Sequence, residues 1–285
     1  MRSIILTGAT SGIGLESARL LAKRGFFVVG VGRDRDRCAA AQREIERVRP
    51  GAQAAFFTAD LSCQGEVARV AKELAATAAD SGGELRALIH NAGGVRGWYT
   101  TTEDGYEYQF ALNYLAIFLL THCLLDELMR WHTRVLITGS ASHRNARMRW
   151  DDVMFARRYR PLAAYAQSKL CGLLFAKGLN DRYADKGIRA CVVDPGLVKT
   201  EIGSKDAGGL VDLVWSLRKI GGAPCARPAQ TFASLCECET PSTDLYVRDG
   251  KAEKYSAQVT AENADRLFSL SQKLCGVTYA RRPGA

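Results

Sequence analysis

The chain has 285 residues and carries 39 Lys and Arg against 30 Asp and Glu, so its formal net charge is +9. Its 47% hydrophobic and 24% charged residues are typical of a globular protein and exclude disorder, collagen and a coiled coil. The longest mostly apolar stretch, 111–125, is interrupted by polar residues and falls short of the roughly 18–20 residues that a membrane-spanning helix needs. The basic balance favours an anionic ligand, which could be a nucleotide, a nucleic acid or a membrane surface.

The chain enters an apolar run at Ile4, so we expect no signal peptide and a cytoplasmic protein. Its nine cysteines are scattered and contain no CxxC pair. We therefore interpret them as reduced thiols and expect no metal site.

Short apolar runs typical of strands alternate with helical patterns along the chain. The strand patterns cover 3–7, 26–31, 53–58, 87–90, 134–138, 190–193 and 245–247. The helical patterns cover 15–23, 36–48, 64–79, 104–130, 163–184 and 260–274. This alternation predicts an α/β fold, a doubly wound, Rossmann-type parallel sheet with helices on both faces. The chain shows no linker or repeat, so we expect a single domain over residues 1–285.

Two segments interrupt the alternation. Residues 142–162 form an insertion rich in Arg and aromatic residues, a composition that can bind nucleic acid. Asp151 and Asp152 interrupt this basic run, which favours a solvated face or a guide for an acidic substrate.

Residues 201–226 contain the apolar patch 210–217 between pairs of glycines. We expect a lid that closes over a hydrophobic substrate. A fixed helix, on the core or at a subunit contact, and a peripheral contact with a lipid surface are the alternatives.

A glycine-rich turn, Thr7-Gly-Ala-Thr-Ser-Gly-Ile-Gly14, follows the first predicted strand and opens the first helix. Gly8 allows the tight turn, Gly12 allows a pyrophosphate to approach the backbone, and Gly14 allows the helix to pack on the strand. The free N–H groups at the start of the helix attract phosphate. The turn therefore predicts a dinucleotide site.

The residues after the second predicted strand indicate which dinucleotide binds. Gly32 stands where an acidic residue would hold the free ribose of NAD, and Arg33 follows it with a guanidinium that can pair with a 2′-phosphate. We expect NADP to be preferred, with NAD as the alternative. A solvated turn is the other interpretation of Arg33. Asp60, at the end of the third strand, either meets the adenine or caps the next helix.

Tyr165 and Lys169 are four residues apart in a helical pattern, so they share one face of the helix. A phenol titrates near 10, and a neighbouring ammonium favours its ionised form, which suits proton transfer. Ser140 ends the preceding strand, and the carboxyl ends of parallel strands face the ligand crevice. These residues predict an acid/base site beside the dinucleotide.

Together these motifs resemble the short-chain dehydrogenase/reductase family over nearly the whole chain. The motifs, in the family's order, are TGATSGIG at 7–14, Asp60-Leu61, Asn91-Ala92-Gly93, Asn113, Ser140, Tyr165 with Lys169, and Pro195-Gly196 with Thr200. The resemblance implies that Tyr165 donates the proton, Lys169 activates it and binds ribose, and Ser140 holds the substrate oxygen. It also implies that Asn113 keeps a water in a proton relay.

The expected cofactor contacts are Gly8, Thr10, Ser11, Gly12, Ile13, Gly14, Arg33, Asp60, Leu61, Asn91, Ala92, Gly93, Tyr165, Lys169, Pro195, Gly196, Val198 and Thr200. The chain resembles one branch of the family most. The resemblance lies in the sequences of 140–143 and 164–170, in the insertion between Ser140 and Tyr165, and in the tail 244–274. This branch contains the retinol dehydrogenases, protochlorophyllide reductase and the WW-domain oxidoreductase. His90 departs from the pattern, because Asn often precedes Asn91-Ala92-Gly93 in the family.

We therefore expect an NADP(H)-dependent oxidoreductase that moves a hydride between nicotinamide and a carbonyl or alcohol. We expect the substrate to be a small hydrophobic molecule, and we expect no nucleic-acid partner. The family also suggests a homodimer or homotetramer through 104–130 and 163–184. The alternative function is a catalytically silent, nucleotide-sensing regulator on the same fold.

Overall fold

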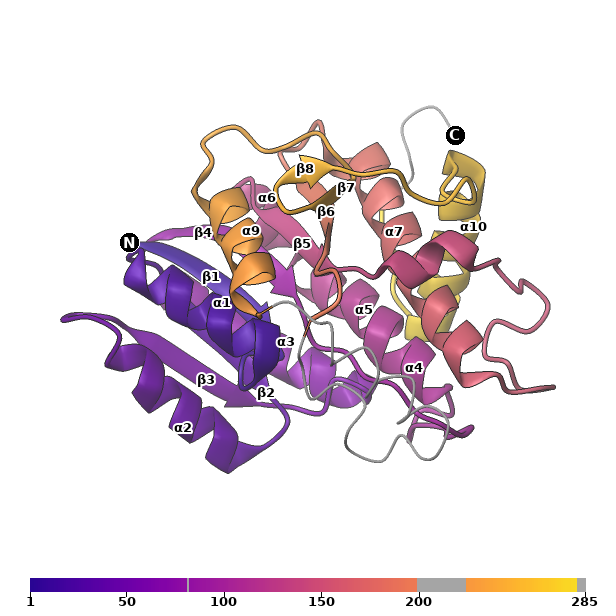
Figure 1. The fold of residues 1–285 in the computed structure, drawn as a ribbon, viewed down its shortest axis with the longest axis horizontal. Helices are drawn as coiled ribbons and strands as arrows, with labels where there is room; N and C mark the ends of the chain where they lie inside the picture. Colours follow the sequence, from indigo (N-terminus) through magenta and orange to yellow (C-terminus); the bar gives the residue numbers. More distant parts are fainter. Residues whose placement is uncertain (81, 199–223, 281–285) are drawn as a thin grey trace.

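A computed structural model describes residues 1–80, 82–198 and 224–280 (Figure 1). The strands of these residues are β1 (Arg2–Thr7), β2 (Phe27–Gly32), β3 (Ala54–Thr58), β4 (Glu84–His90), β5 (Arg134–Thr138), β6 (Arg189–Asp194), β7 (Tyr246–Arg248) and β8 (Lys251–Ala252). They form one sheet in the order β3-β2-β1-β4-β5-β6-β7-β8, in which β8 alone is antiparallel to its neighbour. The structure confirms the predicted doubly wound α/β fold.

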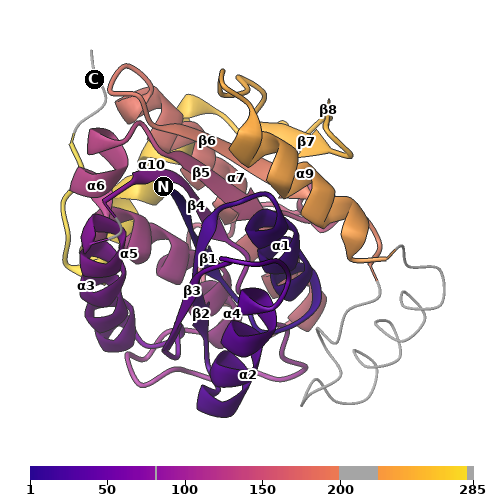
Figure 2. The same cartoon turned by 90° about the vertical axis from the view of Figure 1, so that its left-hand side faces the viewer.

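Helices cover both faces of the sheet. They are α1 (Gly12–Lys23), α2 (Arg35–Glu46), α3 (Gln64–Asp80), α4 (Tyr108–Phe110), α5 (Ala116–Cys123), α6 (Leu125–Arg130), α7 (Pro161–Tyr183), α9 (Ala226–Glu237) and α10 (Ala261–Cys275). Figure 2 shows α1, α2 and α9 on one face, with α3, α5 and α6 on the other. Each face has its own apolar core, and Leu21 and Phe232 belong to one core whereas Leu74, Phe118 and Phe175 belong to the other.

The order of the strands reverses between β1 and β4. In sheets of this kind ligands bind outside the carboxyl ends of the strands at the point of reversal. The segments that follow β1, β4, β5 and β6 carry the motifs found in the sequence, so the topology brings these motifs to one edge of the sheet.

The helix expected over 104–130 is wrong in its start and its continuity. The carboxylate of Glu107 accepts hydrogen bonds from the N–H groups of Gln109 and Phe110, so α4 begins only at Tyr108. A π-helix, η1 (Ala111–Leu115), then separates α4 from α5. Neither α9 nor β8 was expected from the sequence.

The insertion 142–162 starts in a short 3₁₀ helix, η2 (Ala141–Asn145), and has irregular structure from there to α7. Its far end is anchored, because the hydroxyl of Tyr159 donates to Glu107 Oε1 at 2.9 Å. Several of its arginines face carboxylates, with Arg157 at 3.2 Å from Asp151. The predicted lid lies outside the described residues as far as residue 223, and Ala226 begins α9.

The C-terminal helix α10 packs on α7, where the ring of Phe268 stacks on Phe175 with centroids 5.4 Å apart. Beyond α10, Tyr279 is 3% exposed and donates a hydrogen bond to the carbonyl of Phe118 at 2.8 Å. The parts of α5 and α7 that face α10 and Tyr279 are therefore covered by this chain itself. An oligomer through 104–130 and 163–184 stays a prediction.

Within residues 1–80, 82–198 and 224–280, no helix has both the length and the apolar character to cross a membrane. The same residues hold no group of three or more metal-ligating side chains. All nine cysteines are free thiols.

His90, the residue that departs from the family's pattern, is 3% exposed at the end of β4. Its Nε2 lies 2.9 Å from Thr121 Oγ1, and the Thr121 hydroxyl already donates to the carbonyl of Ile117. The ring nitrogen must therefore donate, which a neutral imidazole can do. Burial lowers the pKa of His90 to about 3.

We predict that His90 makes the folded protein sensitive to mild acid. Between pH 6.5 and about 3 the unfolded chain binds a proton at this position that the folded chain does not, so stability falls as the pH falls. Lowering the pH from 7.5 to 5.5 should cost about 1.4 kcal/mol through this residue. Urea unfolding of the protein and of His90→Gln at both pH values measures the difference. Equal losses in the two proteins would contradict the prediction.

Candidate active site

The glycine-rich turn between β1 and α1 leaves the start of the helix open to a ligand. Gly8 and Gly12 have φ values of +66° and +53°, which favour glycine. A Cβ on Gly14 would lie 2.0 Å from the carbonyl oxygen of Gly8, so only glycine fits there. The N-cap Ser11 makes no side-chain cap, and no acidic residue stands in the first turn of α1. These N–H groups can therefore receive an anion.

The side chain of Asn91 connects this turn to the neighbouring strands. Its amide nitrogen donates to the carbonyls of Thr7 and Gly8 at 3.3 and 3.2 Å. Its amide oxygen accepts a hydrogen bond from the hydroxyl of Thr138, at the end of β5. Asn91 thus holds the ends of β1, β4 and β5 together.

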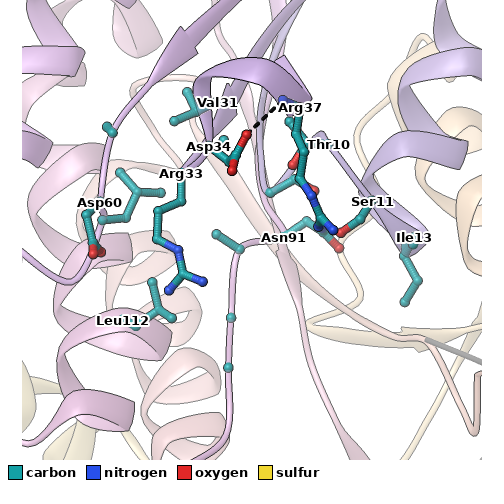
Figure 3. Close-up of a pocket in the computed structure, with 18 of the residues that line it drawn as sticks. Thr10, Ser11, Ile13, Val31, Arg33, Asp34, Arg37, Asp60, Asn91 and Leu112 are labelled. Carbon is teal, nitrogen blue, oxygen red and sulfur yellow. Dashed lines mark hydrogen bonds between the residues drawn. The ribbon is translucent and has the colours of Figure 1, made fainter. Parts of the chain in front are cut away.

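A cavity of about 380 Å³ extends from the glycine-rich turn along the ends of β2, β3 and β4 (Figure 3). Arg33, between β2 and α2, and Arg37, in the first turn of α2, point into it (Figure 3). Arg96 lines it from the segment after β4. The described residues that line the cavity therefore include three guanidinium groups and two carboxylates, those of Asp34 and Asp60.

The last residue of β2, Gly32, is closed to an acidic side chain. A Cβ on Gly32 would lie 2.5 Å from the Thr10 methyl group, so the residue that would pair with free ribose hydroxyls has no room. Arg33 Nη1 lies 3.5 Å from the hydroxyl of Tyr108, and the Arg96 guanidinium lies 4.7 Å from the centre of the same ring. Sequence reasoning missed Arg96 and Tyr108, because only the fold brings them to Arg33.

Asp60 performs a local role and also borders the cavity. Its Oδ1 accepts hydrogen bonds from the N–H and the hydroxyl of Ser62, at 2.9 and 2.7 Å. The first N–H of α3, on Gln64, bonds instead to Asp104. Asp60 therefore shapes the turn before α3 and, with Leu61, lines the cavity.

A second cavity, of about 130 Å³, lies outside the ends of β5 and β6. Its lining includes Ser140, Tyr165 and Lys169 together with residues 194–198. Ile13, Asn91, Gly93 and Gly94 border both cavities, so the two are neighbours. Most of the predicted catalytic and cofactor residues line one of these two cavities. Gly14 and Asn113 line neither: Gly14 packs beneath Gly8, and Asn113 bonds to Gly94. Thr200 lies outside the described residues.

Tyr165 and Lys169 lie one turn apart on α7, and each is 8% exposed. Lys169 Nζ lies 5.8 Å from the centre of the Tyr165 ring and donates to the carbonyl of Thr138 at 2.9 Å. Burial lowers the pKa of Lys169 from its ordinary value of 10.5 to about 8.

Ser140 and Asn113 complete the predicted set. Ser140 Oγ lies 3.0 Å from the hydroxyl of Ser142, which donates to it. Asn113, inside the π-helix η1, donates to the carbonyl of Gly94 at 2.9 Å and accepts from its N–H at 2.8 Å. A Cβ on Gly93 would meet Asn113 Oδ1 at 3.0 Å and Lys169 Nζ at 3.7 Å, so Asn113 and Lys169 flank the same glycine.

Comparison with known proteins agrees with this geometry. The profile of the short chain dehydrogenase family matches residues 2–208. Retinol dehydrogenase 12 of Mus musculus is 33% identical over 280 residues, which cover 97% of this chain and 87% of that protein.

Two solved structures are similar over the whole chain. A protein from Mycobacterium paratuberculosis has a TM-score of 0.76 at 28% identity, with 99% of this chain and 96% of the other covered. A short-chain dehydrogenase from Sphingobium yanoikuyae, in complex with NADPH, has a TM-score of 0.67 at 22% identity, with 100% and 99% covered.

The family match and the retinol dehydrogenase relatives cover most of the chain, and they confirm the resemblance found in the sequence. The chain belongs to the retinol dehydrogenase branch of the short chain dehydrogenase family and is an oxidoreductase that acts on alcohol or carbonyl groups.

Proposed function

We propose that this protein is an NADP(H)-dependent dehydrogenase or reductase of hydrophobic alcohols or carbonyls, with Tyr165 as its general acid and base. One observation carries the proposal. Tyr165, Lys169 and Ser140 line a cavity that adjoins the glycine-rich cavity at Asn91 and Gly93. A proton donor and a nucleotide site in neighbouring cavities are what hydride transfer to a carbonyl requires.

The residues present fit a nicotinamide dinucleotide. The uncapped start of α1 suits the pyrophosphate, and the cradle between Gly8 and Gly14 admits no side chain. The second cavity, bordered by Pro195, Gly196 and Val198, would receive the nicotinamide end. Nicotinamide, when bound, supplies or accepts the hydride.

The side chains of this chain would move the proton and hold the oxygen. Tyr165 gives its phenolic proton to the carbonyl oxygen during reduction and takes it back during oxidation. Ser140 donates a hydrogen bond to that oxygen, and the ammonium of Lys169 favours the ionised phenol. Asn113 holds Gly94, and with it the segment that borders both cavities, through two hydrogen bonds.

The preference for NADP over NAD rests on charge and on space. Arg33, Arg37 and Arg96 surround the part of the cavity that would receive the 2′-phosphate, and Gly32 leaves no room for a carboxylate. The NADPH complex of the Sphingobium relative supports this choice. Leu197 and Val198 at the second cavity, and the name of the retinol dehydrogenase relative, support an apolar substrate.

Replacing Tyr165 by Phe should abolish turnover and spare cofactor binding. The change keeps the ring and removes the proton, and a general acid contributes roughly 10²–10⁴-fold in rate. NADPH absorbance with a panel of apolar aldehydes and ketones measures turnover, and quenching of protein fluorescence measures binding. Wild-type turnover by Tyr165→Phe would refute the proposed mechanism.

Replacing Arg33 by Ala should reduce the preference for NADPH over NADH by about ten- to a hundredfold, since it removes one charge-assisted contact. The loss should fall on NADPH, with the dissociation constant of NADH nearly unchanged. Arg158→Ala, an exposed guanidinium in the insertion, is the matched control and should change neither constant. Equal affinity of the unmutated protein for the two cofactors would exclude the preference.

Replacing Lys169 by Met should stabilise the protein while it removes activity. Burial lowers the pKa of Lys169 from 10.5 to about 8. Below pH 8 the folded chain therefore carries the full cost of desolvating the Lys169 ammonium, about 3 kcal/mol. Loss of the bond to Thr138 offsets about 1 kcal/mol, so we expect a net gain of about 2 kcal/mol at pH 7.

The stability gained by Lys169→Met should shrink as the pH rises from 8 to 10.5. In this range the unfolded chain still holds the proton that the folded chain has lost, so the unmutated protein becomes more stable as the pH rises. Urea unfolding of both proteins at pH 7 and at pH 10 measures this. A Lys169→Met variant that is less stable at pH 7 would contradict the prediction.

A further inference from the structure

Tyr246 stands beside the second cavity without lining it. It is the first residue of β7, pairs with Val192 of β6, and is 1% exposed. Its hydroxyl donates a hydrogen bond to Asp194 Oδ2 at 2.7 Å. The residues singled out in the sequence did not include this tyrosine.

Asp194 ends β6 and shapes the segment that follows it. Its second oxygen, Oδ1, accepts a hydrogen bond from the N–H of Gly196 at 2.9 Å. Gly196 has a φ of +69°, and a Cβ there would meet the Arg248 guanidinium at 3.2 Å, so the backbone turn is tightly specified. The carboxylate thus connects β7 to the turn that borders the second cavity.

A carboxylate that is 3% exposed depends on its hydrogen bonds. Burial and the contact with Asp194 raise the pKa of Tyr246 well above its ordinary value, so the phenol keeps its proton and remains the donor. Removing the hydroxyl would leave one buried oxygen of Asp194 without this partner. The carboxylate would then turn toward other donors or admit water, and the Gly196 turn would move with it.

The Tyr246 ring also contacts the turn that carries Ser140. The ring lies 4.7 Å from the ring of His143 at an angle of 70°, and a Cβ on Gly139 would meet its Cε2 at 3.2 Å. His143 is fully buried, and its Nδ1 lies 2.6 Å from the carbonyl oxygen of Ser140. One side chain therefore contacts both Asp194, which holds the Gly196 turn, and His143, which holds the Ser140 turn.

We propose that Tyr246 is a positioning residue for the nicotinamide end of the site. It holds the turn 195–198 in place through Asp194, and it holds Ser140 in place through His143. The proposal rests on the proposed function, because it places the nicotinamide beside this turn. Tyr246 lines neither cavity, so it acts on the site through the residues it contacts, Asp194, His143 and Gly139.

The test uses Tyr246→Phe, which keeps the ring against His143 and Gly139 and deletes the donor. Tyr183→Phe is the matched control, since Tyr183 is 1% exposed and its hydroxyl accepts a hydrogen bond from the N–H of Ala280, at the far end of α7. Two ligands separate the ends of the site: NADPH, which has a nicotinamide, and 2′,5′-ADP, which lacks one.

For Tyr246→Phe we expect the dissociation constant of NADPH to rise about ten- to a hundredfold, the range for losing a hydrogen bond to a charged group. That of 2′,5′-ADP should stay unchanged, because its contacts lie at the glycine-rich turn and Arg33. A general loss of structure would weaken both ligands. The double variant Tyr246→Phe/Asp194→Asn should recover part of the NADPH affinity, since a neutral amide still accepts from Gly196 and no longer needs the second donor as strongly.

With a substrate in hand, kcat of Tyr246→Phe should fall, and the isotope effect on kcat with NADPH deuterated at the transferred position should rise. Unchanged NADPH binding, equal weakening of both ligands, or the same changes in Tyr183→Phe would each overturn the proposal. The binding experiment needs no turnover. If Tyr165→Phe remained active, the proposed function would fail while the separate response of NADPH and 2′,5′-ADP would still decide the role of Tyr246.

Discussion

The hydrogen bonds of Asn91 join three strand ends into one rigid edge. The amide holds the carbonyls of Thr7 and Gly8 with its nitrogen and the hydroxyl of Thr138 with its oxygen. Thr138 in turn offers its carbonyl to Lys169. Asn91, Thr138 and Lys169 therefore connect the glycine-rich turn to the helix that carries Tyr165, and the spacing between the nucleotide end and the reaction end of the site depends on this chain of hydrogen bonds.

Burying the polar groups of the site costs folding free energy, and the rest of the fold offsets that cost. Lys169, Asp194 and Asn113 are buried, and each makes specific hydrogen bonds within the protein. Two apolar cores, one on each face of the sheet, provide the stability that permits such a site. The anchored end of the insertion follows the same rule, because the buried carboxylate of Glu107 is satisfied by two backbone N–H groups and Tyr159.

The sequence was sufficient for the fold and for most of the site, because both rest on local patterns. The alternation of apolar runs and helical spacing predicts the sheet, and glycines between a strand and a helix predict the phosphate cradle. The π-helix at Ala111–Leu115 left no such pattern, since its residues other than Asn113 are apolar or aromatic like those of an ordinary buried helix. Helix α9 was missed, although Phe232, Ala233 and Cys236 have helical spacing.

The residues that sequence reasoning missed at the site are those that meet it only through the fold. Arg96 and Tyr108 are distant from Arg33 in sequence and meet it because β2 and the segment after β4 end at the same edge. Tyr246 reaches Asp194 because β7 pairs with β6. Contacts between strands that are far apart in the chain carry no signal in a single sequence.

A crystal structure of the protein with NADP⁺ tests the account most directly. The account predicts the pyrophosphate at the start of α1, the 2′-phosphate within hydrogen-bonding distance of Arg33, and the nicotinamide between Tyr165 and the Gly196 turn. A dinucleotide whose pyrophosphate lies away from α1, or whose nicotinamide lies outside the cavity of Ser140, Tyr165 and Lys169, would contradict it.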